Sequence, residues 1–445
     1  MKHNAIPEDE SADTQEAPSS PESLKESGLS LSFVCDMILK ALYTRGTMIG
    51  RDLAQFLHLP FKVIQQSIKF LKEEKQIEIM GGDLVGEVSY RFSLTDLGRK
   101  RSHEAMELCG YVGPAPVPIE DYVEQCYRQS VTGLPCTPEM LRSPFSHLVI
   151  REQLFNALGP AIISGRSVFI YGPPGNGKTA IARAIGEFMN QSGGSIYVPH
   201  AFIADGNIIT VFDPSLHQVD EGEDRYGEVD SVVKRLLSSG AVDARWVRIK
   251  RPVIVTGGEL ALSMLDLRYN AEAKFYQAPI HFKANGGVFL IDDFGRQICS
   301  PKELLNRWIL PLEDRHDFLT VSNGKKFLVP FEQLIIFSTN LDPKDLVDDA
   351  FLRRIRHKVG IEAPVRDVYE KIFNNYAKKL GMNPCPEAIG YLYERYYDRG
   401  RTPRASDCRD LLEIVQSICR YKRQPVHLTR DLMIEASSSF IAEFT

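Results

Sequence analysis

The chain has 445 residues, enough for about two to four domains with cores of their own, and its 43% apolar and 25% charged residues are ordinary for a soluble protein. No apolar run approaches the roughly 18 residues that a membrane span needs, no signal peptide is visible, and the eight cysteines form no C-x-x-C pair. These features argue against a membrane protein, a zinc module and a disulfide framework, and they favour a reduced cytoplasmic setting.

The net negative charge of the chain comes from its N-terminal segment. The first 28 residues hold two lysines and seven acidic residues, so the remainder of the chain balances at 51 basic and 51 acidic residues. A neutral body gives no general argument for binding to nucleic acid or to a membrane. Residues 1–29 are also rich in Ser and Pro and poor in large apolar groups, so we expect a disordered acidic tail there.

Residues 30–108 have the pattern of a small helical domain that ends in two strands. Apolar spacing predicts helices at 31–44, 49–57 and 61–75, followed by strands at 77–80 and 87–93. Three helices and a β-wing resemble a winged helix-turn-helix domain. We therefore expect a winged-helix-like domain at the start of the folded chain.

Two roles for this domain stay open. A DNA-binding role would place the third helix in the major groove, with its outward side chains Lys62, Gln65, Gln66 and Lys69. However, residues 31–108 hold 11 basic and 10 acidic residues, the predicted wing carries Asp83 and Glu87, and DNA affinity comes largely from neutralised phosphates. Contact with a protein or docking of subunits is the favoured role, and DNA binding is the alternative.

The next segment, 109–145, is rich in proline. Its six prolines indicate a semi-rigid connector that contains one short helix at about 120–128. A helix across 149–158 then leads into a larger domain, which we place at 146–360.

A glycine-rich loop is the most informative motif in the chain. It fits G-x-x-x-x-G-K-[ST] and consists of Gly172, Pro173, Pro174, Gly175, Asn176, Gly177, Lys178 and Thr179. The apolar run 167–171 predicts a buried strand before it, and Ala180 continues into a helix after it. This order points backbone N–H groups and the positive end of a helix at a phosphate. Lys178 would reach the β- and γ-phosphates of a nucleotide, and Thr179 would hold Mg²⁺.

Two later strands end in polar side chains. Residues 286–291 run into Asp292 and Asp293, and residues 334–339 run into Asn340. Parallel α/β sheets place their chemistry at the C-terminal ends of the strands. We expect Asp292 to support Mg²⁺ through water, Asp293 to polarise the attacking water and Asn340 to orient it. A core strand that stops at an acidic turn is the simpler alternative, and the phosphate loop upstream argues against it.

Two consecutive arginines, Arg353 and Arg354, follow an apolar turn. They are either a solvated helix end or a finger that reaches the γ-phosphate of a neighbouring subunit. Such fingers accelerate hydrolysis by roughly 10³–10⁵ where measured.

Taken in this order, these pieces resemble the AAA+ ATPases over about 300 of the 445 residues. The resemblance implies an α/β P-loop core, made of a parallel sheet between helices, with a helical lid at 361–445. It assigns the Walker A loop, the Walker B acids, the sensor-1 residue Asn340, the arginine-finger position and a sensor-2 arginine at Arg404. It also implies ATP and Mg²⁺ as ligands, ATP hydrolysis at subunit interfaces and a homo-oligomer, typically a hexameric ring that remodels a protein partner.

The resemblance narrows to one clade. Residues 284–287 look like the A-x-x-G lead-in of enhancer-binding activators, magnesium chelatases and MoxR-type ATPases, which add β-hairpins to the core. Asn323 and Gly324 lie between apolar runs and predict one hairpin, and residues 202–209 are a second candidate. In such rings, Lys325 and Lys326 would face an axial channel and touch the polymer or partner. The alternative is that both hairpins only extend the surface.

The chain departs from the family pattern at Asp293, where the family usually has Glu. Asp is a competent base but one methylene shorter, and a misplacement of roughly 1 Å can cost about 100-fold in rate. Three functions therefore compete: an oligomeric ATPase that remodels a protein, an ATP-gated DNA-binding regulator, and a slowly hydrolysing nucleotide switch or scaffold. The first is favoured.

Overall fold

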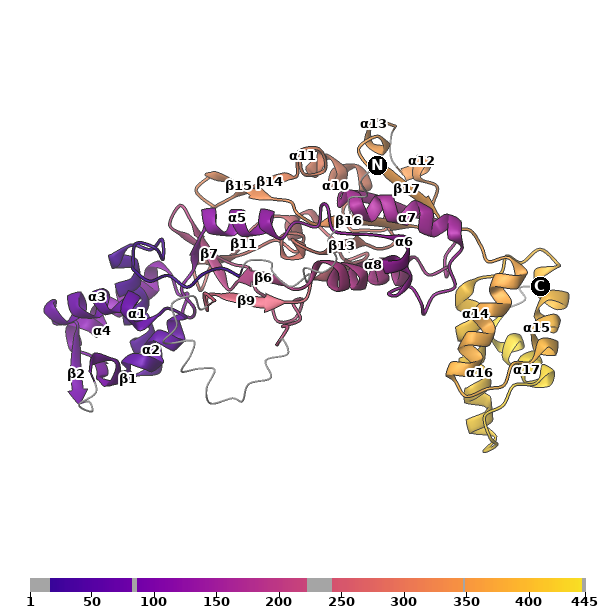
Figure 1. Cartoon of the computed structure of the whole chain (residues 1–445), viewed down its shortest axis with the longest axis horizontal. Helices are drawn as coiled ribbons and strands as arrows, with labels where there is room; N and C mark the ends of the chain where they lie inside the picture. The colour runs from indigo at the N-terminus through magenta and orange to yellow at the C-terminus, as the bar shows by residue number, and fades with distance from the viewer. Residues whose placement is uncertain (1–16, 82–85, 222–241, 347–348, 442–445) are drawn as a thin grey trace, which may run out of the picture.

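The computed structural model describes residues 17–81, 86–221, 242–346 and 349–441. Figure 1 shows the N-terminal helices at one end of an elongated molecule, a central region built on sheets, and a separate group of helices at the C-terminal end. Within the described ranges, no helix is both long and apolar enough to cross a membrane.

The N-terminal part contains the three predicted helices. Its elements are α1 (Leu31–Arg45), β1 (Met48–Ile49), α2 (Gly50–Leu57), α3 (Phe61–Glu73), β2 (Ile77–Gly81), β3 (Arg91–Leu94) and α4 (Asp96–Leu108). β3 pairs antiparallel with both β1 and β2. The strand predicted at 87–93 begins later than expected, because Glu87–Ser89 forms a 3₁₀ turn. The predicted wing turn at Gly82 and Asp83 lies outside the described residues.

The acidic N-terminal segment is ordered over its described part, so the prediction of a disordered tail is wrong for residues 17–29. Pro18 O accepts a hydrogen bond from Asp243 N at 2.8 Å, and Ser27 O accepts one from Arg245 Nη1 at 2.9 Å. Arg245 is itself buried and paired with Asp243 at 2.8 Å. Composition did not reveal this contact because Ser27 and Arg245 are 218 residues apart. Residues 1–16 lie outside the described residues.

A five-stranded parallel sheet forms the centre of the molecule. Its order is β10 (Val253–Thr256), β13 (Val288–Ile291), β16 (Leu334–Thr339), β5 (Ser167–Tyr171) and β17 (His357–Gly360). All neighbouring strands are parallel, so their C-terminal ends lie along one edge. β5 lies beside β16 and one strand from β13, which brings the glycine loop to the same edge as the polar ends of those two strands.

Helices cover both faces of this sheet. Val168 and Ile170 of β5 pack with α7 (Glu152–Ser164) and α8 (Lys178–Gly193), whereas Phe169 packs on the other face with Leu304 and Trp308. The second face is covered by α10 (Pro301–Arg307) and α11 (Ile309–Asp314), and the short helices α12 (Pro343–Leu346) and α13 (Asp349–Leu352) follow β16. The predicted α/β fold, with a parallel sheet between helices, is confirmed.

A second five-stranded sheet lies between the central sheet and the N-terminal helices (Figure 1). Its order is β11 (Arg268–Asn270), β12 (Phe275–Gln277), β8 (Asn207–Thr210), β7 (Ala201–Ala204) and β4 (Val117–Pro118). Both predicted hairpins are present: β7 with β8, and β14 (His316–Thr320) with β15 (Lys326–Pro330). A further antiparallel pair joins β6 (Ile196–Pro199) to β9 (Trp246–Ile249).

The proline-rich segment 109–145 is more than a connector. It supplies β4 to the second sheet and forms α5 (Ile119–Arg128) and α6 (Pro138–Arg142). Tyr122 of α5 is buried against Phe202 and Phe282. The short helix predicted in this segment is therefore present, but it belongs to the packed core.

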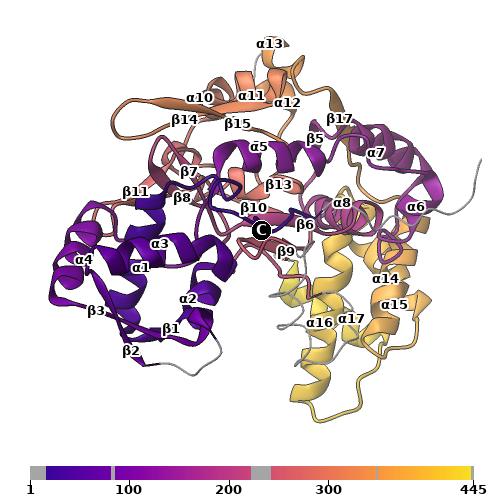
Figure 2. The ribbon, with the colours of Figure 1, turned by 60° about the vertical axis from the view of Figure 1, so that its left-hand side comes forward.

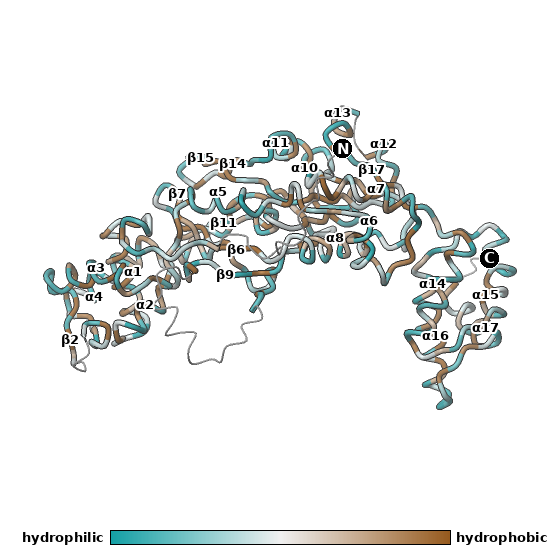
Figure 3. Tube along the Cα trace, viewed as in Figure 1, coloured by the Kyte–Doolittle hydropathy of each residue, from teal (hydrophilic) through white to brown (hydrophobic). Residues whose placement is uncertain are grey.

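The C-terminal helices have a core of their own. They are α14 (Arg366–Lys379), α15 (Pro386–Leu392), a π-helical turn Tyr393–Tyr397, α16 (Ala405–Tyr421) and α17 (Arg430–Phe440). Brown apolar and teal polar segments alternate along them (Figure 3), as expected of helices with one buried face. Figure 2 shows this group beneath α8, and the start of α16 reaches the glycine loop.

Candidate active site

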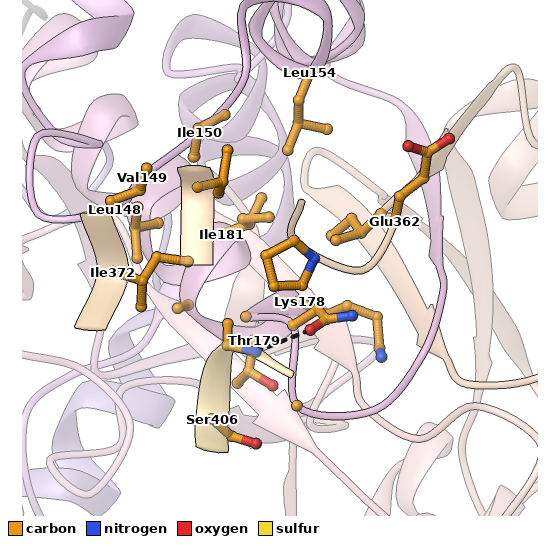
Figure 4. A pocket seen from close by; sticks show the side chains of 18 of the residues that line it. Leu148, Val149, Ile150, Leu154, Lys178, Thr179, Ile181, Glu362, Ile372 and Ser406 are labelled. Carbon is orange, nitrogen blue, oxygen red and sulfur yellow. Dashed lines mark hydrogen bonds between the residues drawn. The ribbon is translucent and has the colours of Figure 1, made fainter. Parts of the chain in front are cut away.

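A cleft of about 740 Å³ lies where the glycine loop, the ends of β13 and β16, and the C-terminal helices meet. Its polar lining includes residues 174–180 of the loop, Asp292, Asp293 and Asn340. Its apolar lining includes Leu148, Val149, Ile150, Leu154, Ile181, Val359, Ile361, Ile372 and Tyr376. In Figure 4, Leu148, Val149, Ile150 and Ile372 gather on one side, and Lys178, Thr179 and Ser406 lie on another. The cleft therefore has separate polar and apolar ends.

The glycines of the loop are required by its main-chain path. Gly172 has φ of 145°, and a Cβ at this residue would lie 2.0 Å from Ile361 O. Gly177 has φ of 82° and is the N-cap of α8. Both conformations are strained for residues with a side chain, so glycine lets β5 turn directly into α8. As a result, the N-terminus of α8 opens on the cleft.

Lys178 is the cation at the centre of the site. Its Nζ donates to Gly172 O at 2.9 Å, to Pro173 O at 3.1 Å and to Asn340 Oδ1 at 2.5 Å. Burial lowers the pKa of Lys178, and the nearby carboxylates of Asp292 and Asp293 oppose that shift. The geometry joins the end of the loop to the end of β16 through one ammonium group.

Thr179 and Asp292 form the oxygen pair that a magnesium ion would need. Thr179 Oγ1 donates to Asp292 Oδ2 at 2.5 Å. A hydroxyl and a carboxylate in contact, beside a phosphate-binding loop, supply the hard oxygen ligands that Mg²⁺ prefers. The donor set therefore fits this ion.

Asp293 lies at the start of a tight turn. Its φ is 49°, and its Oδ1 accepts a hydrogen bond from Asn340 Nδ2 at 2.9 Å. Gln297 Nε2 donates to Asp292 O at 2.9 Å, and Phe294 N donates to Ser338 O at 2.7 Å. The turn is thus tied to β16, and Asp293 and Asn340 face each other beside Lys178.

The predicted arginines do not line the cleft. Arg353 is exposed, and Arg354 pairs through Nε with Glu313 Oε1 at 2.7 Å. Arg404 is the N-cap of α16, and its side chain is exposed. Arg409, five residues further along α16, does line the cleft. The loop, the two acids and Asn340 lie together, as the sequence predicts, whereas no sequence pattern points to Arg409.

The apolar end of the cleft was also missed. It is built from the segment before α7, the end of β17 and α14, which are far apart in the sequence. Each segment taken alone has the pattern of ordinary core, so the sequence carries no local signal for this surface. Its aliphatic side chains and the ring of Tyr376 form an apolar surface of the kind that lines many ligand pockets.

Comparisons with known proteins add little to this geometry. A family model described as a domain of unknown function, DUF8689, matches residues 365–439, which cover most of α14 to α17. No curated protein matches the chain.

Several solved structures resemble the chain distantly. The Holliday junction branch migration motor RuvB of Thermotoga maritima is 16% identical over 67% of this chain and 73% of that chain, with a TM-score of 0.36. NtrX from Brucella abortus is 14% identical over 78% and 61%, with a TM-score of 0.38. Domain III of the Thermotoga maritima replication initiation protein DnaA is 15% identical over 69% and 100%, with a TM-score of 0.37. At these values the likenesses carry no argument, and the fold assignment rests on the sheet order and the loop.

Proposed function

We propose that this chain is an AAA+ type ATPase that binds ATP with Mg²⁺ in the cleft, hydrolyses it and uses the cycle to remodel a protein partner. The observation that carries the proposal is the cluster of Lys178, Thr179, Asp292, Asp293 and Asn340 at one edge of a parallel sheet. Two of these residues open α8, two follow β13 and one follows β16, and together they form one hydrogen-bonded group.

The cluster supplies the groups that phosphoryl transfer requires. Lys178 would exchange its main-chain partners for the β- and γ-phosphate oxygens, and Thr179 and Asp292 would hold Mg²⁺, which neutralises charge that develops on the phosphates. Asp293 and Asn340 would orient the water. As water bonds to the γ-phosphorus, the bond to the bridging oxygen breaks, Asp293 takes a proton from the water and ADP leaves with the bridging oxygen.

Replacing Lys178 tests the proposal. Lys178→Ala should weaken ATP binding at least tenfold and abolish measurable hydrolysis, because a charge-assisted contact with the phosphates is lost. The control is Gln191→Ala, which removes an exposed amide from the same helix. Unchanged binding and turnover of Lys178→Ala would reject the proposal.

Assembly into a homo-oligomer, such as a hexameric ring, is part of the proposal. The cleft has no contribution from Arg353 or Arg354, so a finger would have to come from a neighbouring subunit. Turnover per subunit should rise with protein concentration and fall about 10³-fold in Arg354→Ala. If Arg353→Ala and Arg354→Ala both leave turnover intact, the finger role is wrong for both.

We interpret residues 30–108 as a winged-helix-like domain that recruits the protein partner. Lys62 and Gln65 on the exposed face of α3 contact acidic residues: Lys62 Nζ lies 3.5 Å from Glu22, and Gln65 Nε2 donates to Glu87 at 2.8 Å. These acids would oppose a phosphate backbone, so the contacts favour a protein partner over DNA. Salt-sensitive binding of duplex DNA to the full chain would reverse this choice.

A further inference from the structure

The N-terminus of α16 rests on the glycine loop. Ala405 N donates to Asn176 Oδ1 at 3.1 Å, and Ser406 N donates to Gly175 O at 2.8 Å. The residue that precedes the helix, Arg404, makes no side-chain cap. Asn176 therefore acts as the capping side chain of a helix that begins 229 residues later in the chain.

Gly175 allows this close approach. A Cβ at Gly175 would lie 2.4 Å from Ser406 Oγ, and the main chain there has φ of 79°. A residue with a side chain would strain the main chain at this φ and would displace the Ser406 side chain. Gly175 thus leaves room for the start of α16, and Asn176 caps it.

The amide nitrogen of Asn176, Nδ2, donates no hydrogen bond to the described residues. Asn176 is 9% exposed and lines the cleft, and its Nδ2 has no hydrogen-bond partner among the residues that the structure describes. Because Oδ1 must face the Ala405 N–H, the amide cannot turn over without placing donor against donor. A buried, unpaired donor is costly unless something accepts from it.

The helices that follow the central sheet share one core with α16. Leu411, Leu412 and Val415 of α16 are buried in the core of the C-terminal helices, together with Tyr369 and Phe373 of α14. Ile372 and Tyr376, on the same α14, line the apolar end of the cleft. A change at the start of α16 therefore reaches both ends of the cleft.

We propose that Asn176 is a positioning residue that couples the phosphate chain of the nucleotide to the C-terminal helices. Its Oδ1 caps α16, and its Nδ2 donates to a phosphate oxygen of the bound nucleotide. Nucleotide binding satisfies the unpaired donor and holds the cap in place. This coupling rests on the proposed function, since it requires a nucleotide in the cleft.

Two substitutions distinguish the acceptor role of Asn176 Oδ1 from the donor role of Nδ2. Asn176→Asp keeps an acceptor for Ala405 N but replaces the donor with a negative oxygen. Asn176→Ala removes both. Hydrogen exchange at Ala405 and Ser406, measured without nucleotide, reports the cap, and binding of ADP with Mg²⁺ reports the donor. Circular dichroism of each variant verifies that it is folded, and Gln191→Ala serves as the control for both measurements.

Exchange at Ala405 should be about fivefold faster in Asn176→Ala, the usual effect of losing a cap, and unchanged in Asn176→Asp. ADP affinity should fall at least tenfold in Asn176→Asp. Unchanged exchange in Asn176→Ala would overturn the cap, and unchanged ADP affinity in Asn176→Asp would overturn the phosphate contact. If the unaltered protein binds no ADP, the proposed function fails together with the phosphate contact, whereas the exchange result still decides the cap.

Discussion

The main chain at Asp293 adopts a left-handed conformation, with φ of 49°. Asp and Asn tolerate this region because their short side chains bond locally, whereas a longer residue such as Glu rarely adopts it. Asp293 N donates to Asp292 Oδ1 at 3.1 Å, and the Asp293 carboxylate accepts from Asn340 Nδ2 at 2.9 Å. The left-handed turn therefore favours the short carboxylate of Asp at this residue.

Substitutions at this residue test that explanation. Asp293→Asn should lower turnover at least 100-fold and leave nucleotide binding nearly intact, because only the proton acceptor is lost. Asp293→Glu should also lower turnover, by roughly 10- to 100-fold, since the carboxylate is displaced by about 1 Å on a strained main chain. Steady-state ATP hydrolysis at saturating ATP measures both. A large gain in Asp293→Glu would instead identify a slow nucleotide switch.

At the scale of elements, the lead-in to β13 is held by one buried amide. Asn285 Nδ2 donates to Tyr122 Oη at 3.0 Å and to Pro330 O at 3.1 Å, and its Oδ1 accepts from Glu332 N at 2.9 Å. The amide thus joins α5, the end of β15 and the approach to β16. These contacts fix the path of the chain into β13.

Asn285→Ala should lower the free energy of unfolding by about 2–4 kcal/mol, because it leaves several buried polar groups without partners. Urea denaturation measures the change. The exposed amide Gln191 is the matched control, and Gln191→Ala should shift the free energy by less than about 0.5 kcal/mol. Equal effects of the two substitutions would show that Asn285 is not a junction between these elements.

What the sequence could predict depended on how local the signal was. The glycine loop, the strands that end in Asp292 and Asn340, and the Asn323–Gly324 hairpin all have short patterns with a direct physical meaning, and each is found in the structure. Apart from the β7–β8 hairpin, the second sheet had no such pattern, since it pairs β4 with β7 and β8 with β12 across long stretches of chain. The order of residues 17–29 depends on a buried arginine distant in sequence. Contacts between short segments far apart in the sequence were therefore the part of the structure that the sequence did not predict.

At the scale of the whole molecule, the N-terminal helices share one apolar core with the second sheet. Ala201 and Ile208 of that sheet belong to the same cluster as Leu57 of α2 and Ile64 of α3. His58, at the end of α2, contacts His200 with ring centroids 4.9 Å apart. Burial, with a smaller contribution from His58, lowers the pKa of His200 to about 4. The contact between the N-terminal helices and the second sheet therefore favours the neutral form of His200.

This junction should lose stability in acid. His200 has an ordinary pKa of about 6.5 in the unfolded chain, so its contribution is complete above that pH and is lost as the pH falls towards 4. The loss at pH 5 should be about 1–2 kcal/mol. Denaturation of the wild type and of His200→Phe at pH 7.5 and pH 5 isolates this residue. The other histidines with lowered pKa values, His217, His281 and His357, are present in both proteins. An equal pH dependence of the two would contradict the assignment.

Because α16 is long and contacts the glycine loop only at its start, a small rotation there would move its far end much further. Its 17 residues span roughly 25 Å at 1.5 Å per residue, and only its first residues touch the loop. A tilt of about 10° at that end would carry the far end through roughly 4 Å, simply from the length of the arm. Tyr421, the last residue of α16, is 88% exposed and would sweep the surface with it. A tilt that begins at the contact with Asn176 would thereby displace Tyr421 by several ångströms at the molecular surface.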